Sequence, residues 1–99
     1  MAAIKITITP SAYADADRIG TFLDENWSPE IAIRFFNAFY RILDMLETSP
    51  EVGTPSLKVA GIRRKMIDRY NALYYDFRDG EVVVLRLYDT RSNPADNPY

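Results

Sequence analysis

Arginine and tyrosine side chains lie among apolar positions in residues 61–91, and they are the best candidates for chemistry in this chain. An arginine guanidinium can hold phosphate or carboxylate oxygens through paired hydrogen bonds, and a tyrosine phenol can donate a proton. The apolar residues between them recur with the short period of β-strands. A sheet face that mixes these groups indicates a binding surface. The candidates are Arg63, Arg64, Tyr74, Arg86, Tyr88 and Arg91.

The same residues also have a purely structural interpretation. Arginine stems cover apolar surface, and tyrosine is common in strands. Taken singly, each of Arg64, Arg86 and Tyr74 is therefore expected to be structural, whereas their coincidence on one uncovered face favours binding. Arg91 differs because it follows a predicted strand, where packing explains it less well.

Composition excludes several classes of catalytic site. The chain has 99 residues and contains neither cysteine nor histidine. Thiolate nucleophiles, sulfur-ligated metals and Ser-His-Asp sites are therefore impossible. The carboxylates show no metal-ligand spacing, and no glycine-rich phosphate loop exists. We expect no metal and no cofactor.

Charge is distributed unevenly along the chain, whose formal net charge is −2. Residues 1–56 contain four basic and eight acidic side chains, whereas residues 57–91 contain eight basic and five acidic ones. An anionic partner would be steered to the second half. The acidic total argues against bulk adhesion to nucleic acid, and we expect no direct sequence-specific DNA binding.

One domain over residues 1–91 and an irregular C-terminal tail over residues 92–99 are expected from the length and from the prolines of the tail. The first residues do not read as a signal peptide, and no run is long enough to span a membrane. We therefore expect a cytoplasmic protein with no membrane partner.

The hydrophobic pattern predicts an α+β fold in the order β-α-α-β-β-β. Ile4–Ile8 alternates as a strand, and Thr9-Pro10 and Ser28-Pro29 each read as a helix cap followed by proline. The short connection predicts a helical hairpin. Residues 50 to about 60 form a loop, and three strands follow. The N-terminal strand and the hairpin are expected to pack on one face of this antiparallel sheet.

The turn at Asp79-Gly80 decides which strand residues share a face. A three-residue loop gives one apolar core face, and we predict it on that ground. The core face would then contain Leu73, Tyr75, Val83, Leu85 and Leu87, and the open face would contain Tyr70, Ala72, Tyr74, Val84, Arg86 and Tyr88.

Helix side chains supply further expectations. Trp27 could be a binding aromatic, but it lies on the apolar stripe of the first helix and is expected in the core or as a hydrophobic staple. Phe36 and Tyr40, four residues apart, are expected to form an exposed pair that contacts a partner. The acids of the first helix are expected to form a solvated face: Asp15, Asp17, Asp24 and Glu25.

The chain resembles the RelE/ParE superfamily of bacterial toxins in its order of elements and in four short motifs. The exit from the second helix matches the superfamily's leucine, proline and glycine pattern, and the strands match its arginine and tyrosine patterns. These motifs reach to about Pro94: Leu46-Glu-Thr-Ser-Pro50-Glu-Val-Gly53, Gly61-Ile-Arg63-Arg64, Tyr70-Asn-Ala-Leu-Tyr74-Tyr75 and Val82-Val-Val-Leu-Arg86-Leu-Tyr-Asp-Thr-Arg91.

The resemblance implies the toxin of a type II toxin–antitoxin module, held inactive by a small antitoxin. Its long helical hairpin and its acidic balance are similar to the ParE and plasmid-stabilisation branch, which implies growth inhibition through DNA gyrase. Asp89-Thr90 stands where many relatives have histidine and glycine. No catalytic residue is then expected. The residues expected to face the target or antitoxin are Phe36, Tyr40, Arg63, Arg64, Tyr74, Arg86, Tyr88 and Arg91.

The alternative is a RelE-like endonuclease that cleaves mRNA on the ribosome. RNA cleavage needs a base, an acid for the leaving oxygen and cations on the phosphate. In that case Arg64, Arg86 and Arg91 would supply the cations, and Tyr88 or Tyr74 the acid. The base would be a tyrosine activated by neighbouring arginines, or Asp89, which would also repel the phosphate. The sequence alone leaves the ribosome open beside gyrase as the target.

Overall fold

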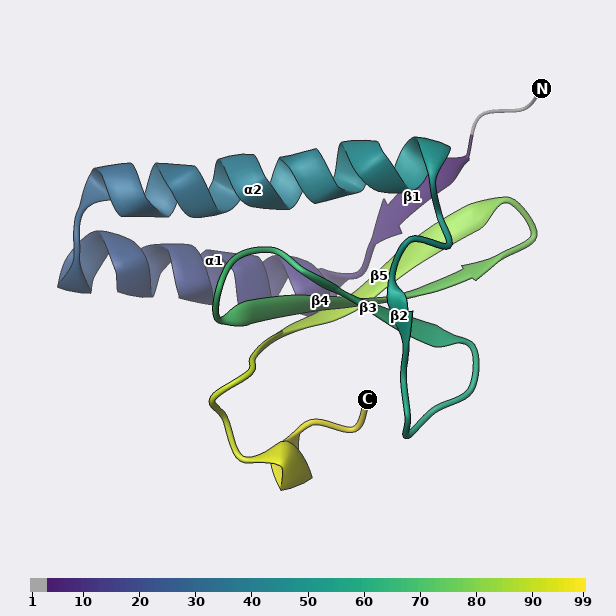
Figure 1. Cartoon of the computed structure of the whole chain (residues 1–99). Helices are drawn as coiled ribbons and strands as arrows, with labels where there is room; N and C mark the ends of the chain where they lie inside the picture. Colours follow the sequence, from purple (N-terminus) through teal and green to yellow (C-terminus); the bar gives the residue numbers. More distant parts are fainter. Residues whose placement is uncertain (1–3) are drawn as a thin grey trace.

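Residues 4–99 are described by a computed structural model, in which a helical hairpin lies against one face of a sheet (Figure 1). Residues 1–3, which begin the segment predicted not to be a signal peptide, lie outside the described residues. The predicted α+β class is confirmed, but the sheet is mixed and has five strands. The N-terminal strand was predicted to pack on one face of the sheet, which is wrong: it pairs in parallel at the edge of the sheet. A short strand, Thr54–Pro55, also lies in the segment predicted to be a loop. The elements are β1 (Lys5–Ile8), α1 (Pro10–Asn26), α2 (Pro29–Thr48), β2 (Thr54–Pro55), β3 (Ile62–Met66), β4 (Asn71–Arg78), β5 (Glu81–Asp89) and the 3₁₀ turn η1 (Pro94–Asp96).

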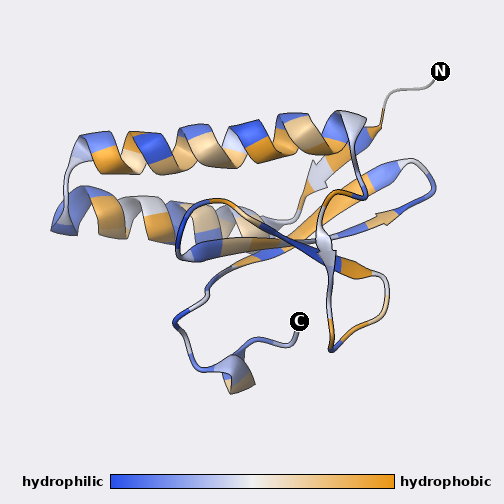
Figure 2. Ribbon diagram, in the orientation of Figure 1, coloured by the Kyte–Doolittle hydropathy of each residue, from blue (hydrophilic) through white to orange (hydrophobic). Residues whose placement is uncertain are grey.

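Both helices begin at the predicted caps. The Thr9 hydroxyl accepts the backbone N–H of Ala12 at 3.1 Å, and the Ser28 hydroxyl accepts that of Ile31 at 3.2 Å. Each cap satisfies an N–H that has no partner inside the helix, and a proline follows it as the first helical residue. Hydrophilic and apolar residues alternate along both helices (Figure 2), as amphipathic packing on a core requires.

Gly20 allows the two helices to approach each other closely. A Cβ atom added to Gly20 would lie 2.4 Å from the ring of Phe36, which no real structure tolerates without movement. The glycine therefore makes room for an aromatic ring between the helices. This close approach explains why α1 keeps a residue that costs about 1 kcal/mol of helix propensity relative to alanine.

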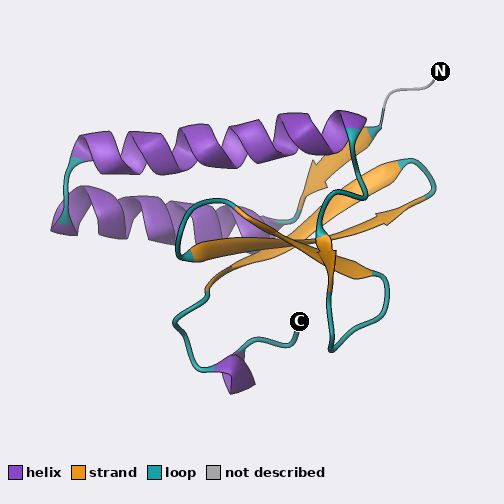
Figure 3. Ribbon diagram, in the orientation of Figure 1, coloured by secondary structure: helices purple, strands orange, loops and turns teal. Residues whose placement is uncertain are grey.

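The sheet has the order β1-β5-β4-β3-β2. Strand β1 pairs in parallel with β5, with Ile6 opposite Val82, and every other neighbouring pair is antiparallel. The helices lie together on one side of the sheet, and the segment after β5 lies on the other (Figure 3). The sheet therefore has one face in the core and one face without helices.

The predicted three-residue turn is wrong. Arg78 pairs with Glu81, so the loop has two residues, and both Asp79 and Gly80 adopt positive φ, at 54° and 73°. This geometry matches the right-handed twist of the flanking strands. The two-residue loop turns Val82 and Val84 into the core, where each is fully buried.

A β-bulge explains how the apolar pattern misled the prediction. Tyr74 pairs with Arg86 but Tyr75 pairs with Val84, so Leu85 has no partner residue on β4. The extra residue shifts the alternation by one, which returns Leu87 to the core face. Of the predicted faces, Leu73, Tyr75 and Leu87 lie in the core and Tyr74 and Tyr88 on the open face, as expected. Val83, Leu85 and Val84 lie on the faces opposite to those predicted.

Candidate functional site

A groove of about 650 Å³ lies between the connected ends of α1 and α2 and the end of β5. Its apolar lining comes mostly from the helices, and two of its aromatic side chains are strongly exposed, Trp27 at 72% and Phe22 at 53%. The core position predicted for Trp27 is therefore wrong. The apolar lining consists of Ile19, Phe22, Leu23, Trp27, Ile31 and Phe35, with Leu87 at the sheet.

The rim of the groove is basic. Four arginines line it, against the two carboxylates of Asp68 and Asp89. Both carboxylates already accept internal hydrogen bonds. Asp68 accepts from the backbone N–H groups of Tyr70 and Asn71, each at 2.8 Å, and Asp89 binds Arg91. The groove thus combines an apolar floor with an excess of positive charge, from Arg18, Arg34, Arg69 and Arg91.

Arg91 is held in place at this rim. Its Nε and Nη2 atoms donate to the two oxygens of Asp89, at 3.0 and 2.7 Å, and its guanidinium lies 3.9 Å from the ring centroid of Tyr70. The hydrogen bond from Arg91 lowers the pKa of Asp89, against the opposing effect of burial. Asp89 therefore stays ionised near neutral pH and is a weak base.

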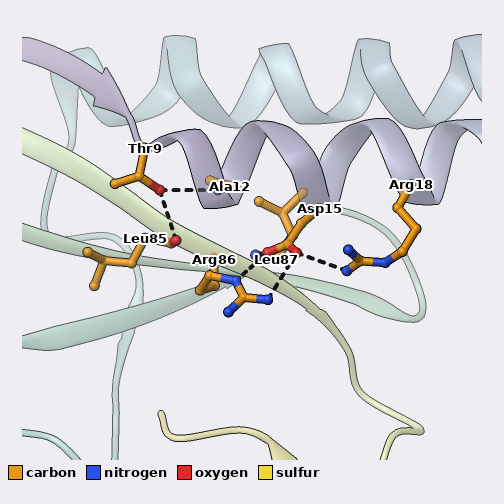
Figure 4. A network of polar contacts seen from close by, with 7 residues as sticks. All are labelled: Thr9, Ala12, Asp15, Arg18, Leu85, Arg86 and Leu87. Carbon is orange, nitrogen blue, oxygen red and sulfur yellow. Dashed lines mark hydrogen bonds and ion pairs between the residues drawn. The ribbon is translucent and has the colours of Figure 1, made fainter.

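Arg86 is paired with the buried carboxylate of Asp15 instead of standing free on the open face (Figure 4). Its Nε and Nη2 atoms donate to Asp15 on α1, at 2.7 and 3.1 Å. Arg18 donates to the same carboxylate at 2.9 Å, and so does the backbone N–H of Leu87 at 3.0 Å. Asp15 is 1% exposed. The solvated face predicted for Asp15 is wrong.

The end of β1 explains why a carboxylate is needed here. Strand β1 pairs with β5 only as far as Val84, so the next part of β5 has no strand on that side. The Thr9 hydroxyl donates to the Leu85 carbonyl at 3.0 Å, and Asp15 accepts from the Leu87 N–H. The start of α1 thereby satisfies backbone groups that would otherwise be buried without partners.

A sequence signal for Asp15 did exist. It lies at helical spacing with the buried residues Ala12 and Ala16, and therefore on the apolar stripe of α1. A carboxylate on an apolar stripe needs a cation or other hydrogen-bond donors beside it. Burial alone would raise the pKa of Asp15, but the hydrogen bonds from Arg86, Leu87 and Arg18 outweigh it and lower the pKa. The Asp15 hydrogen bond in turn raises the pKa of Arg86.

The helix-free face of the sheet brings several predicted residues together. The Tyr74 and Tyr88 rings meet edge to face with centroids 6.0 Å apart, and the Arg86 guanidinium lies 5.0 Å from the Tyr88 ring centroid. Arg64 pairs with Tyr74 across the strands and is exposed. Among residues 4–99, no hydrogen bond or ion pair involves the Arg64 side chain.

Arg63 has a structural role in the loop after α2. It donates to the carbonyls of Glu51 and Gly53, at 3.1 and 2.8 Å. Tyr75, which the sequence analysis placed only in the core, fixes the same loop: its hydroxyl accepts the Gly53 N–H at 2.9 Å and donates to the Pro50 carbonyl at 2.7 Å. Burial raises the pKa of Tyr75.

The exposed pair predicted on α2 does not form. Phe36 is partly buried against the core and lies beside Phe35, with centroids 5.3 Å apart, whereas Tyr40 is 55% exposed. Phe36 turns inward because Gly20 leaves space for its ring. Only Tyr40 of this pair presents most of its surface to solvent.

Within residues 4–99, no three acidic side chains cluster closely enough to hold a metal ion. In the same part of the chain, neither helix carries an apolar stretch that could cross a bilayer. Two of the predicted site arginines, Arg86 and Arg91, are bound by carboxylates whose pKa is lowered. This arrangement suits binding better than proton transfer, because such carboxylates are poor bases.

Solved structures share this fold. The chromosomal ParDE TA system from P. aeruginosa superposes with a TM-score of 0.76 at 19% identity, covering 89% of this chain and 97% of that chain. A YoeB/ParE toxin from Agrobacterium tumefaciens gives a TM-score of 0.60 at 18% identity, covering 86% and 96%. The YoeB dimer from Staphylococcus aureus gives 0.60 at 16%, covering 86% and 94%. At these identities the likeness shows the fold alone.

Sequence comparison identifies the family. No curated protein matches the chain. The model of the ParE toxin of the type II toxin–antitoxin system parDE matches residues 6–94. Since this match covers most of the chain, and the fold agrees with it, the protein belongs to the ParE toxin family of type II toxin–antitoxin systems.

Proposed function

We propose that this chain arrests growth by binding DNA gyrase and not by catalysis, and that a cognate antitoxin neutralises it. The observation that carries the proposal is that two of the three candidate catalytic arginines are already bound by carboxylates of this chain. Arg86 is bound to Asp15 and Arg91 to Asp89, and both carboxylates have lowered pKa values. With no histidine in the chain, a general base near neutral pH is lacking.

The antitoxin, on this proposal, lays an amphipathic helix in the groove between the helical hairpin and the sheet. The apolar floor with Phe22 and Trp27 suits the apolar stripe of such a helix. The arginine rim favours acidic side chains beside that stripe, because opposite charges steer and orient the complex. Aromatic side chains in a groove are also frequent hot spots of binding energy.

Two variants on one helix test the docking. Phe22→Ala removes a groove side chain that is 53% exposed, and Tyr13→Ala removes a side chain outside the groove lining that is 56% exposed. We expect Phe22→Ala to weaken antitoxin binding by about 2 kcal/mol, as a hot spot does. Tyr13→Ala should change it by less than about 0.5 kcal/mol. Titration calorimetry with the cognate antitoxin measures both. Equal effects of the two variants would count against the groove.

The target is tested by inducing this chain without antitoxin in a bacterial host. DNA supercoiling and mRNA integrity are followed in the same culture. Arrest with relaxed or broken DNA and intact mRNA supports gyrase as the target. Cut mRNA with normal supercoiling would replace the proposal with ribosome-dependent mRNA cleavage. Arg91→Ala should relieve the arrest while the protein stays folded.

A further inference from the structure

Residues 94–99, which we call the strap, fold back across the helix-free face of the sheet. The Tyr99 ring stacks on the Tyr74 ring, with centroids 5.6 Å apart and planes at 28°. The Asn97 side-chain amide donates to the Tyr74 hydroxyl at 3.0 Å. Residues that are distant in the sequence thus meet on this face, and Tyr74 is left only 6% exposed.

The loop between β2 and β3 holds the backbone of the strap. The Lys58 ammonium donates to the carbonyls of Pro94 and Asn97, at 2.8 and 2.7 Å. The Ser56 hydroxyl donates to a backbone oxygen of Tyr99. These contacts recognise backbone oxygens and one aromatic ring, which many extended peptides can present.

The strap is held weakly enough to be exchanged. Most of its residues are exposed, and Lys58 is exposed as well. Hydrogen bonds at such positions contribute little net free energy, because water replaces them when they open. A cavity of about 370 Å³ remains beside it, lined by Arg64, Tyr74 and Tyr99, so the strap fills the face only in part.

We propose that the helix-free face of the sheet is a docking site for an extended peptide that carries an aromatic side chain, and that the strap occupies this site in the free protein. A partner's peptide would displace the strap, stack its ring on Tyr74 and offer its backbone oxygens to Lys58 and Ser56. The exposed Arg64 beside the site adds a contact for a carboxylate of that peptide. The proposal goes beyond the proposed function and does not depend on it.

The test measures nitration of tyrosines by tetranitromethane in the purified chain, mapped by mass spectrometry. Three tyrosines report on different surroundings. Tyr74 lies under the strap, Tyr75 is fully buried in the core beneath the helices, and Tyr40 is 55% exposed. In the unmodified chain Tyr40 should react while Tyr74 and Tyr75 are protected. Tyr75 serves as the control for unfolding.

Tyr99→Ala should raise the nitration rate of Tyr74 by about tenfold or more, because a local opening exposes its ring, and leave Tyr75 protected. Lys58→Ala should act in the same direction. The matched control is Lys65→Ala on β3, since Lys65 has no hydrogen bond to the strap among the described residues. Protection of Tyr74 that survives both Tyr99→Ala and Lys58→Ala would overturn the proposal.

A synthetic peptide with the sequence of residues 92–99 tests docking itself. At millimolar concentration, comparable to that of a tethered segment, it should restore the protection of Tyr74 in the Tyr99→Ala chain. The same peptide with alanine in place of its tyrosine should not. If the first peptide does not protect Tyr74, or if both peptides protect it equally, a peptide site that recognises an aromatic ring is refuted. No outcome depends on growth arrest, so the result is separate from that of the proposed function.

Discussion

Asn in place of Asp15 removes the charge of the buried ion pair while keeping the shape of the side chain. The carboxylate is 1% exposed and accepts two hydrogen bonds from Arg86 and one from the Leu87 N–H. In Asp15→Asn the side-chain NH₂ group replaces one carboxylate oxygen. This N–H donor then faces the donors of Arg86 or of the Leu87 backbone, and no hydrogen bond can form between them. The arginine then loses its counter-charge at a site that α1 covers.

The expected loss is about 2 kcal/mol, less than for a fully buried pair, because the Arg86 side chain is 35% exposed and water solvates part of the charge that is left. Arg18 adds little to this figure. Its side chain is 65% exposed, and exposed pairs contribute about 0.5 kcal/mol. With a urea m-value of about 1.5 kcal/mol/M for a domain of this size, the unfolding midpoint should fall by about 1.3 M.

Urea unfolding followed by circular dichroism measures this difference, with Asp17→Asn as the matched control. Asp17 is an exposed acid on the same helix, and its variant should stay within about 0.5 kcal/mol of the parent. Arg86→Met should cost at least as much as Asp15→Asn, because it leaves the buried Asp15 carboxylate without its main counter-charge. The double variant should cost less than the two losses added together, because each removes the same interaction. A loss below about 1 kcal/mol for Asp15→Asn would refute the structural role of the pair.

The same pair predicts a pH dependence. The pKa of Asp15 is lower in the folded state than in the unfolded chain. Its contribution to stability is therefore complete above the unfolded value of about 3.9 and is lost as the pH falls through the folded value. The stability difference between the parent and Asp15→Asn should shrink below about pH 4. A difference that stays constant down to pH 2 would contradict the lowered pKa.

Two further variants test the packing that supports the site. Tyr75→Phe should cost about 1–3 kcal/mol, because it leaves the buried Gly53 N–H and Pro50 carbonyl without the Tyr75 hydroxyl. Tyr40→Phe, on an exposed ring, is its control in urea unfolding. Gly20→Ala should lower the melting temperature, because a Cβ atom 2.4 Å from the Phe36 ring costs more than the roughly 1 kcal/mol of helix propensity that alanine adds. Phe36→Leu in the same chain should recover part of the loss, and a rise in melting temperature for Gly20→Ala alone would contradict the close contact.

Local sequence signals determined the helices and the class of fold. Thr9-Pro10 and Ser28-Pro29 satisfy helix-end N–H groups through neighbours only a few residues away, so their caps are readable from the chain alone. The alternation in residues 61–91 likewise determined the last three strands. The motifs that resemble the RelE/ParE superfamily led to the family that the sequence model supports.

Tertiary structure decided which face of the sheet each β5 side chain occupies and which residue Arg86 binds. A bulge at Leu85 cannot be read from an alternating pattern, because inserting one residue reverses every side chain on one side of it. The burial of Asp15 depended on where β1 ends beside β5. Asp15 binds Arg86 there, although the two residues are 71 positions apart in the chain. The inward turn of Phe36 depended on the space that Gly20 leaves between the two helices. Trp27 is exposed because it lies at the C-cap of α1, beyond the packed part of the helix. A sequence records which residues are apolar or charged, but the partner that each one meets is set by the packing of distant elements.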